Sequence, residues 1–274
     1  MPLRHSEPMV GTEFELSTCG VVQTTHRLAA LLPWTDHDIR ELAAKVPVGW
    51  LDAYDAGPSS RVHGVTPLQA IERLQETAGV VRLLHLEHVP GLRSTVAAVV
   101  TEAQAFFTRT QPVVSSSSVL YVGSGRSSAP AHVDHHPNFF AQLRGTKRFF
   151  VARHASEDLQ QEEIARHFAS RVAGPRCIPD TDVTVHELGP GDALYVPPYT
   201  FHWVESDATT VSAAVSWSTA SSLEQEAVYE FNAGLRRIGV RSAPPGIRPR
   251  LDHVKATVYR SPAAQRVMRL RRPT

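Results

Sequence analysis

The chain has 274 residues and a formal net charge of +1, so it is long enough to bury a complete hydrophobic core without covalent staples. Its two cysteines, Cys19 and Cys177, are too few for a disulfide scaffold, and no apolar run approaches the roughly 20 residues that span a bilayer. These features exclude a small secreted disulfide protein and an integral membrane protein. We expect a cytoplasmic protein that forms one large domain, or one domain with an extension.

Helix signals dominate the N-terminal third, after weak indications of short strands between Thr12 and Gln23. A threonine cap and apolar residues at helical spacing predict a helix from Thr35 to Lys45. A second helix begins at Thr66–Pro67, where threonine is the N-cap and proline occupies the first turn. The apolar run Val80–Leu86 indicates a buried strand, and residues 94–109 favour a third helix.

The middle of the chain is predicted to consist mainly of strands. Residues 115–118, all serine, are expected to form a short loop before the first of them. An insert with helical spacing, Glu157–Ala169, is of the kind that borders the mouth of a barrel. The predicted strands are Val119–Val122, Lys147–Val151, Asp182–Leu188, Ala193–Val196 and Thr209–Trp217. Short strands between flanking helices indicate a β-sandwich or a β-barrel.

The C-terminal region combines an amphipathic helix, Leu223–Ile238, with a basic segment. The apolar stripe of the helix packs on the barrel or pairs with another subunit. Residues 236–274 carry eleven Lys and Arg residues and one acid, Asp252, whereas the other 235 residues carry 17 basic and 26 acidic residues. The basic segment either folds back onto its own body or a sister subunit, or it binds an acidic partner such as RNA. We favour the first, since Tyr259 is its only aromatic residue for base stacking.

The segment from His132 to Lys147 is the most informative part of the chain. It opens with the pattern His-x-Asp, and a further histidine, His202, follows the predicted strand Ala193–Val196. Residues i and i+2 of a strand share one face, so His132 and Asp134 can bind one ion if the segment is extended, while His202 must arrive from another strand. Two histidines and one carboxylate are the open-sided ligand set of non-haem Fe(II) oxygenases.

Other readings of this motif stay open. A His-x-Asp pair arises by chance in a chain with 14 histidines, most often as surface residues or as a hydrogen-bonded pair. A closed structural zinc site takes four ligands and favours cysteine, which the sequence does not offer near the motif. We interpret His135 and His136 as non-ligands, because His135 points to the opposite strand face and His136 directly precedes Pro137.

Lys147 adds a second feature to the predicted site. Gly145 and Thr146 can form a turn, after which Lys147 begins a strand that returns toward the metal ligands. A positive charge in a partly dry pocket is costly to bury unpaired, so it implies an anionic partner. A dicarboxylate that chelates the metal at one end and meets the lysine at the other satisfies both sites. The alternative is an ordinary solvated lysine at a strand end.

These residues resemble a known family, the JmjC-type, cupin-fold Fe(II)/2-oxoglutarate oxygenases. Within that family the sequence is most similar to the branch of the asparaginyl hydroxylase that inhibits hypoxia-inducible factor. The resemblance extends over residues 118–217. In chain order, the matching segments are Pro130–Asp134, Asn138–Gln142, Gly145–Arg148, Gly189–Pro197 and His202–Ser206.

The resemblance implies roles for six residues. Lys147 would pair with the distal carboxylate of 2-oxoglutarate, Asn138 would hydrogen-bond this cosubstrate, and Phe140 would pack against it. The implied iron ligands are His132, Asp134 and His202.

Two positions depart from the family pattern. The family has a threonine that assists the lysine where this chain has Ala129, with Ser128 beside it as a substitute. It also has an asparagine near the cosubstrate where this chain has Ser216, whose hydroxyl can still donate one hydrogen bond. Both departures bear on the fine geometry of cosubstrate binding.

The resemblance sharpens the fold prediction to a mainly β protein with flanking α-helices. Its core would be a double-stranded β-helix of the jelly-roll or cupin type, with N- and C-terminal helices. Residues 1–110 would support the barrel, residues 111–220 would form the catalytic core, and residues 221–274 would form a C-terminal helix and a basic tail. C-terminal helices often make a homodimer in this family, which implies a homodimer here.

The leading functional hypothesis is a dioxygenase that uses Fe(II), 2-oxoglutarate and O2 to hydroxylate an unactivated C–H bond of an amino-acid side chain in a protein or peptide. Free amino acids, biosynthetic intermediates and RNA bases are the alternative substrates, and demethylation would use the same chemistry. The second hypothesis is a metal-binding cupin that is not an oxygenase, such as an isomerase or a binding protein. The third is an inactive scaffold that acts through the basic tail, against which the intact ligand set argues.

Overall fold

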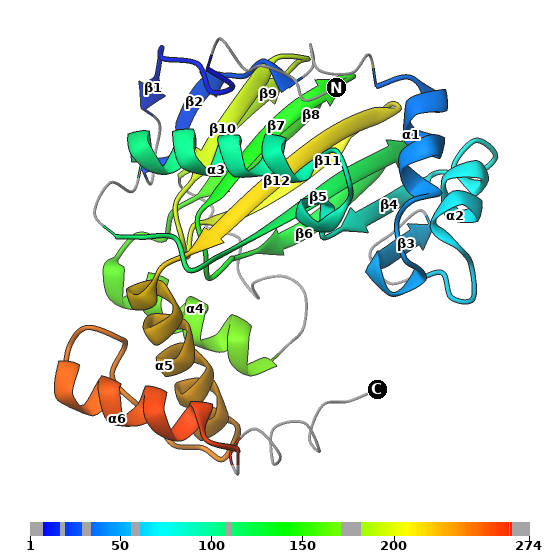
Figure 1. The fold of residues 1–274 in the computed structure, drawn as a ribbon. Coiled ribbons are helices and arrows are strands. Elements are labelled where there is room, and N and C mark those ends of the chain that lie inside the picture. The colour runs from blue at the N-terminus through cyan, green and yellow to red at the C-terminus, as the bar shows by residue number, and fades with distance from the viewer. Residues whose placement is uncertain are drawn as a thin grey trace.

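Two antiparallel β-sheets form the centre of the molecule (Figure 1). The structure, a computed structural model, describes residues 8–16, 20–28, 34–55, 61–107, 111–170, 182–262 and 264. The described strands are β1 (Glu15–Leu16), β2 (Val22–Thr25), β3 (Leu51–Asp55), β4 (Gly79–Leu84), β5 (Ser115–Ser124), β6 (Ser127–His132), β7 (Asn138–Arg144), β8 (Lys147–Ala152), β9 (Val183–Leu188), β10 (Asp192–Val196), β11 (Phe201–Ser206) and β12 (Thr210–Ser218). The larger sheet has the order β1-β2-β10-β7-β12-β5-β4-β3, and the smaller one the order β6-β11-β8-β9.

Helices flank the sheets at both ends of the chain. The described ones are α1 (Asp36–Ala43), α2 (Pro67–Arg73), α3 (Arg93–Phe107), α4 (Glu157–Ser170), α5 (Ala220–Arg237) and α6 (Pro249–Arg260), with short 3-10 helices η3 (Val48–Trp50) and η4 (Leu86–His88). In Figure 1, α3 crosses one face of the larger sheet, and α4, α5 and α6 lie together beside the sheets. This is the predicted mainly β fold with N- and C-terminal helices. No helix in the described ranges is both long and apolar enough to cross a membrane.

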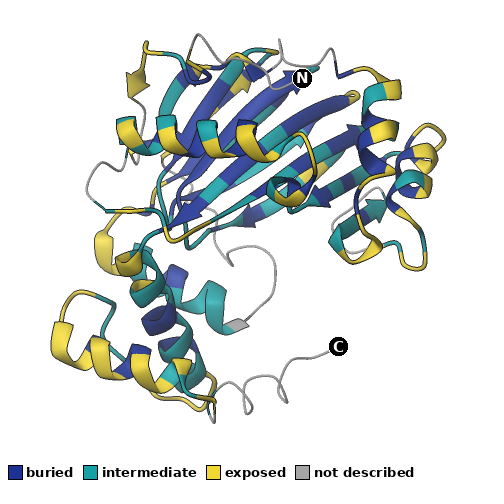
Figure 2. Ribbon diagram, viewed as in Figure 1, coloured by how far each residue is buried: buried dark blue, intermediate teal, exposed yellow. Residues whose placement is uncertain are grey.

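Two of the hydrophobic clusters among the described residues hold the sheets and helices α1 to α3 together. The first lies between the larger sheet and helices α1 to α3, and it includes Val99, Phe139 and Trp217. The second includes Phe140 of β7 and Phe149 of β8, so it lies between the two sheets. Phe139 and Phe140 serve different cores because successive side chains of a strand point to opposite faces. Figure 2 shows the central strands as the most buried part of the fold.

Three of the described helices begin at a capping box. The side chains of Thr35, Thr66 and Thr219 each accept a hydrogen bond from a backbone N–H in the first turn of α1, α2 and α5, respectively. Each such cap stabilises a helix by about 1 kcal/mol. The predicted helix starts at Thr35 and Thr66 are therefore confirmed.

The predicted loop at residues 115–118 is wrong, because these serines are the first residues of β5. They pair with β12 in register, beginning with Ser115 opposite Ser218, and the two hydroxyls are 2.6 Å apart. Ser118 is buried, and its hydroxyl donates to Glu87 at 2.6 Å. Small polar side chains are accommodated in this strand because their hydrogen bonds are satisfied.

Helix α6 lies in the basic segment, for which no helix is predicted. Ala256 of α6 packs against Ala227 and Val228 of α5, with Tyr259 beside them. The buried Lys255 donates to the Ser242 hydroxyl at 2.8 Å. Through residue 264, the described part of the basic segment therefore folds back onto the chain's own body.

Candidate metal centre and adjoining pocket

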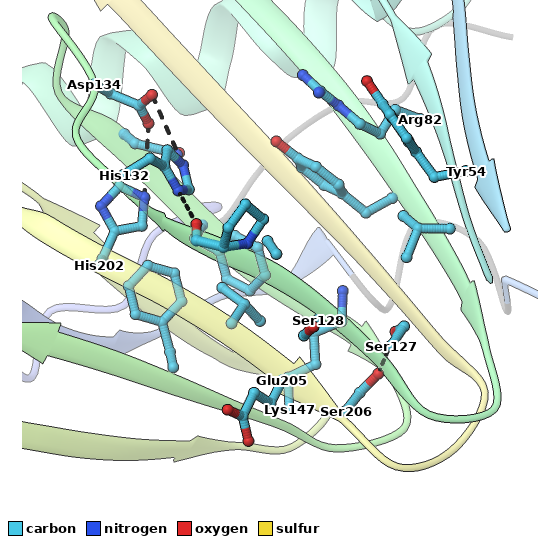
Figure 3. A pocket seen from close by; sticks show the side chains of 18 of the residues that line it. Tyr54, Arg82, Ser127, Ser128, His132, Asp134, Lys147, His202, Glu205 and Ser206 are labelled. Carbon is cyan, nitrogen blue, oxygen red and sulfur yellow. Dashed lines mark hydrogen bonds and ion pairs between the residues drawn. The ribbon is translucent and has the colours of Figure 1, made fainter. Parts of the chain in front are cut away.

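Two histidines from different strands lie side by side in the smaller sheet. His202 of β11 is the direct cross-strand partner of His132, the last residue of β6. Asp134 lies two residues beyond β6, and Figure 3 shows its carboxylate turned toward both imidazoles. Its Oδ1 is 4.0 Å from Nε2 of His132, and its Oδ2 is 3.7 Å from Nε2 of His202. Strand register and a short extension of β6 thus bring His202 beside His132 and Asp134, from which it is distant in sequence.

These three side chains are spaced to share one metal ion. Each offers one ligand atom, and the three atoms all lie within 4.8 Å of one another. The described part of the chain contains no second His, Cys, Asp or Glu cluster of this kind. Three ligands on one side leave about three positions of a six-coordinate ion open to other molecules.

Backbone carbonyls set the orientation of both imidazoles. Nδ1 of His132 lies 2.8 Å from the carbonyl oxygen of Pro130, and Nδ1 of His202 lies 2.9 Å from that of Thr200. A carbonyl oxygen only accepts hydrogen bonds, so each Nδ1 carries the proton and donates. Each Nε2 is then left with its lone pair facing Asp134, as metal-binding histidines require.

The electrostatics of the cluster favour its metal-binding protonation states. Burial alone would raise the pKa of Asp134, but the nearby imidazoles of His202 and His132, followed by His135 and Arg82, outweigh burial and lower it. Burial lowers the pKa of His202 to about 4; the neighbouring His132 acts in the same direction, and Asp134 opposes it. At neutral pH, Asp134 is therefore a carboxylate and His202 a neutral imidazole.

The adjacent histidines His135 and His136 face helix α5 and not the cluster. Nε2 of His135 is 3.6 Å from Glu230, and Nε2 of His136 is 3.2 Å from Glu226. The ring of His135 also stacks on Phe168 of α4, with centroids 3.9 Å apart. These contacts attach the loop that carries Asp134 to α4 and α5.

A cavity of about 620 Å³ adjoins the three-residue cluster, which is within the range of small-molecule sites. Of the residues predicted to bind a cosubstrate, Lys147, Asn138, Phe140 and Ser128 line this pocket. Ser216 is not among the lining residues. It lies opposite Asn138 in the β7–β12 pair, one strand away.

Lys147 presents a buried cation to this pocket. Burial lowers the pKa of its ammonium group to about 7. Nζ lies 5.7 Å from the ring centroids of both Tyr121 and Phe140, and no carboxylate of the described residues is within 4.0 Å of it. The buried Oδ1 of Asn138 likewise has no hydrogen-bond partner among the described residues. Such unmatched groups are expected where a polar ligand completes the site.

Several lining residues lie outside the motifs recognised in the sequence. Of these, Arg82 could have been noticed in the sequence, because it is a charged residue within the apolar run Val80–Leu86. The predicted insert at the mouth of the barrel corresponds to α4, which contributes two of the lining residues. The lining residues missed include Tyr54, Arg82, Tyr121, His167, Phe168 and Glu230.

The fold and the cluster together define a cupin-type protein with a candidate metal centre between its sheets. Residues 84–222, slightly more than half of the chain, match the cupin-like domain family, and the chain belongs to that family. This membership agrees with the predicted jelly-roll core.

Individual relatives support the family assignment. Over 106 residues the chain is 29% identical to Jumonji C domain-containing protein 5 of Drosophila melanogaster, a match that covers 35% of this chain and 26% of that protein. The chain thus spans about a quarter of that relative. The similarity confirms the predicted JmjC-type resemblance, while the asparaginyl hydroxylase branch stays a prediction.

A solved structure shares the fold at low sequence identity. An X-ray structure of Escherichia coli YcfD aligns with a TM-score of 0.51 and 14% identity, covering 92% of this chain and 71% of YcfD. A second YcfD structure, described as a ribosomal oxygenase in complex with cobalt and 2-oxoglutarate, aligns with a TM-score of 0.48 and 14% identity, covering 85% of this chain and 61% of YcfD.

Proposed function

We propose that this protein is an Fe(II)- and 2-oxoglutarate-dependent dioxygenase that hydroxylates an unactivated C–H bond. The observation that carries the proposal is the presence, in one pocket, of an open-sided His–Asp–His cluster and a buried lysine that has no counter-ion among the described residues. A metal ion needs the first feature, and a dicarboxylate that binds this ion needs the second. When bound, ferrous iron and 2-oxoglutarate supply the oxidising chemistry, with O2 as the further cosubstrate.

In this proposal His132, Asp134 and His202 hold the ion. The donor set fits Fe(II), because two neutral imidazoles and one carboxylate suit a borderline divalent cation, whereas an all-oxygen set suits Mg²⁺ or Ca²⁺. The ring of Phe149, another lining residue, stacks on His202 with the ring centroids 5.2 Å apart, which gives the cluster an apolar neighbour. All three ligands line the pocket.

Lys147 is proposed to bind the distal carboxylate of 2-oxoglutarate. Asn138 would supply a hydrogen bond, Phe140 would pack against the carbon chain, and Ser128 would stand in for the missing threonine beside the lysine. Ser216 would act through Asn138, its cross-strand partner. These groups orient the cosubstrate, and a positioned cosubstrate lowers the barrier mainly through proximity.

The substrate is proposed to be an amino-acid side chain of a protein or peptide. The similarity to a Jumonji C domain-containing protein supports a protein substrate, and YcfD, which shares the fold, is described as a ribosomal oxygenase. A free amino acid, a biosynthetic intermediate or an RNA base is the alternative substrate, and a non-oxygenase metal-cupin is the alternative function. We further propose that the protein forms a homodimer through its C-terminal helices, with RNA binding by the basic segment as the less favoured use of that region.

Mass spectrometry of candidate substrates tests the function. Protein supplied with Fe(II), 2-oxoglutarate and O2 should add one oxygen atom to its substrate, and N-oxalylglycine, a mimic of 2-oxoglutarate, should inhibit the reaction. A non-oxygenase cupin would show activity that N-oxalylglycine does not affect. Succinate formation that persists in His132→Ala would contradict the proposal.

A further inference from the structure

Arg82 places a second cation in the wall of the pocket. It lies on β4, directly opposite Tyr121 of β5, and its guanidinium carbon is 5.7 Å from the centroid of that ring. Arg82 and Tyr54 both line the pocket. Figure 3 shows them together on the side away from His202. The pocket therefore has a cationic wall that faces the candidate metal centre across the cavity.

The protein partners of Arg82 do not satisfy its guanidinium group. Its nearest carboxylate is Asp52, at 3.8 Å from Nη1, and Asp52 makes a much closer contact with Arg61. Nε of Arg82 is buried and has no hydrogen-bond partner among the described residues. A guanidinium group has five N–H donors in a planar fork, and leaving a buried donor unmatched is costly.

The charge balance of the pocket does not require Arg82 for binding of the proposed cosubstrate. A divalent ion on Asp134, together with the ammonium group of Lys147, balances the two negative charges of 2-oxoglutarate. The lining carboxylates Asp55 and Glu205 already have guanidinium partners outside the lining, Arg73 at 2.7 Å and Arg148 at 3.2 Å, respectively. The lining carboxylate Glu230 lies 3.6 Å from Nε2 of His135. Arg82 is then left as a cation that faces the cavity, and its one carboxylate neighbour among the described residues, Asp52, is shared with Arg61. A cavity of about 620 Å³ also leaves space beside a molecule as small as 2-oxoglutarate.

We propose that Arg82 binds a carboxylate of the primary substrate and holds the substrate across the pocket from the metal. This inference rests on the proposed function, since that function assigns Lys147 to 2-oxoglutarate. A carboxylate matches the guanidinium fork through two parallel hydrogen bonds, and the Tyr54 hydroxyl can donate a third. The substrate class is therefore acidic: a free carboxylic acid, or a peptide with an acidic side chain next to the reacting C–H bond.

Matched ligand pairs test the inference without turnover. Zn(II)-loaded protein saturated with N-oxalylglycine would be titrated, by NMR or calorimetry, with N-acetylglycine and its uncharged match N-acetylglycinamide. A second pair, N-acetyl-aspartate amide and N-acetyl-asparagine amide, tests a side-chain carboxylate, so the two pairs distinguish a free acid from an acidic peptide. In wild-type protein, at least one acid should bind about tenfold more tightly than its amide. In Arg82→Gln that difference should fall below about twofold.

Arg61→Gln is the matched control, because it removes a guanidinium group from the same Asp52 carboxylate but lies outside the pocket lining. It should retain the preference for the acid. If Arg82→Gln does not fold, Arg82→Lys replaces it, because lysine keeps the positive charge and lacks the planar guanidinium fork. The acids should then bind about threefold more weakly than to wild type, and the binding of the amides should not change. Equal acid binding by wild type and the folded Arg82 variant would overturn the inference.

The affinity for N-oxalylglycine separates the failure of this inference from the failure of the proposed function. It should be unchanged in Arg82→Gln and reduced in Lys147→Ala. A loss of N-oxalylglycine binding in Arg82→Gln would make Arg82 a cosubstrate residue, which overturns the inference and leaves the proposed function intact. Wild-type protein that does not bind N-oxalylglycine would overturn both.

Discussion

His202 lies directly opposite His132 on antiparallel strands, and their ring centroids are 4.2 Å apart. This relationship is set by the backbone register between β6 and β11. The carbonyls of Pro130 and Thr200 then turn each Nε2 toward Asp134. Such preorganisation lowers the conformational cost of binding an ion.

Replacing Lys147 by methionine should stabilise the ligand-free protein and weaken 2-oxoglutarate binding. Burial lowers the pKa of Lys147 to about 7, so the unfolded chain holds this proton more tightly than the folded chain does. The destabilisation by the lysine therefore has its full size below pH 7. It decreases as pH rises from 7 toward 10.5, the ordinary pKa of lysine. The free energy of unfolding of Lys147→Met should exceed that of the wild type by about 1–3 kcal/mol at pH 7, and this pH dependence should disappear.

Chemical denaturation between pH 6 and 10 measures the stability of Lys147→Met, and calorimetry measures its affinity for 2-oxoglutarate, which should fall about tenfold or more. Arg148→Met is the matched control. It is the next residue, but its guanidinium group pairs with Glu205 and Asp207 and does not line the pocket. A Lys147 variant that is less stable at pH 7, with unchanged affinity, would show that the lysine is not an unpaired cosubstrate ligand.

The turn before Lys147 should not tolerate a larger residue than glycine. Gly145 has φ of +72°, and an added Cβ would lie 2.4 Å from the carbonyl oxygen of Thr209. Gly145→Ala should therefore destabilise the protein by about 2 kcal/mol or more and shift β8 with its lysine. Thermal unfolding is the measurement. Gly49→Ala should have a small effect, because no atom lies within 4 Å of the added Cβ, and equal effects of the two variants would contradict this account.

Much of this fold follows from local sequence patterns, because capping and strand periodicity act over a few residues. The starts at Thr35 and Thr66 and the strand that begins at Lys147 are of this kind. The serines at 115–118 mislead, since the propensity of serine for loops is overridden by pairing with β12.

The candidate site was predictable where its residues lie in segments with a recognised motif, as His202 does in a segment apart from the others. His132, Asp134 and Lys147 lie in one segment whose spacing indicates their roles. Arg82 reaches the pocket because β4 pairs with β5, a contact between strands that no local pattern specifies. Ser216 was assigned by resemblance alone, and the strand register places it beside Asn138 and outside the lining.

Removal of residues 241–274 should lower the melting temperature. Helix α6 covers Ala227 and Val228 of α5, and its loss exposes these side chains to water. A decrease of about 4 °C or more is expected by differential scanning calorimetry. Unchanged melting together with lost RNA affinity would instead support an RNA-binding role for the basic segment.

The outer face of α6 should mediate dimer formation. Its apolar residues Leu251, Val254 and Val258 are 41%, 54% and 45% exposed. Asp252 and Lys255 of the same helix are buried and bond to the segment between α5 and α6. A helix that points its apolar stripe outward suits a self-complementary two-fold interface. Val254→Glu should therefore yield monomers by light scattering. Thr257→Glu, a charge at an exposed polar position of α6, is the control and should leave the dimer intact, and a monomeric wild type would contradict the prediction.

The central claim is that one ferrous ion and 2-oxoglutarate bind together between His132, Asp134, His202 and Lys147. Its most direct test is an anaerobic titration of the protein with Fe(II) and 2-oxoglutarate, followed by visible absorption. Wild-type protein should develop a weak charge-transfer band, and His132→Ala should show none. In Lys147→Ala the band should appear only at a 2-oxoglutarate concentration at least about tenfold higher. Absence of the band from metal-loaded wild-type protein, or an unchanged band in His132→Ala, would contradict the claim.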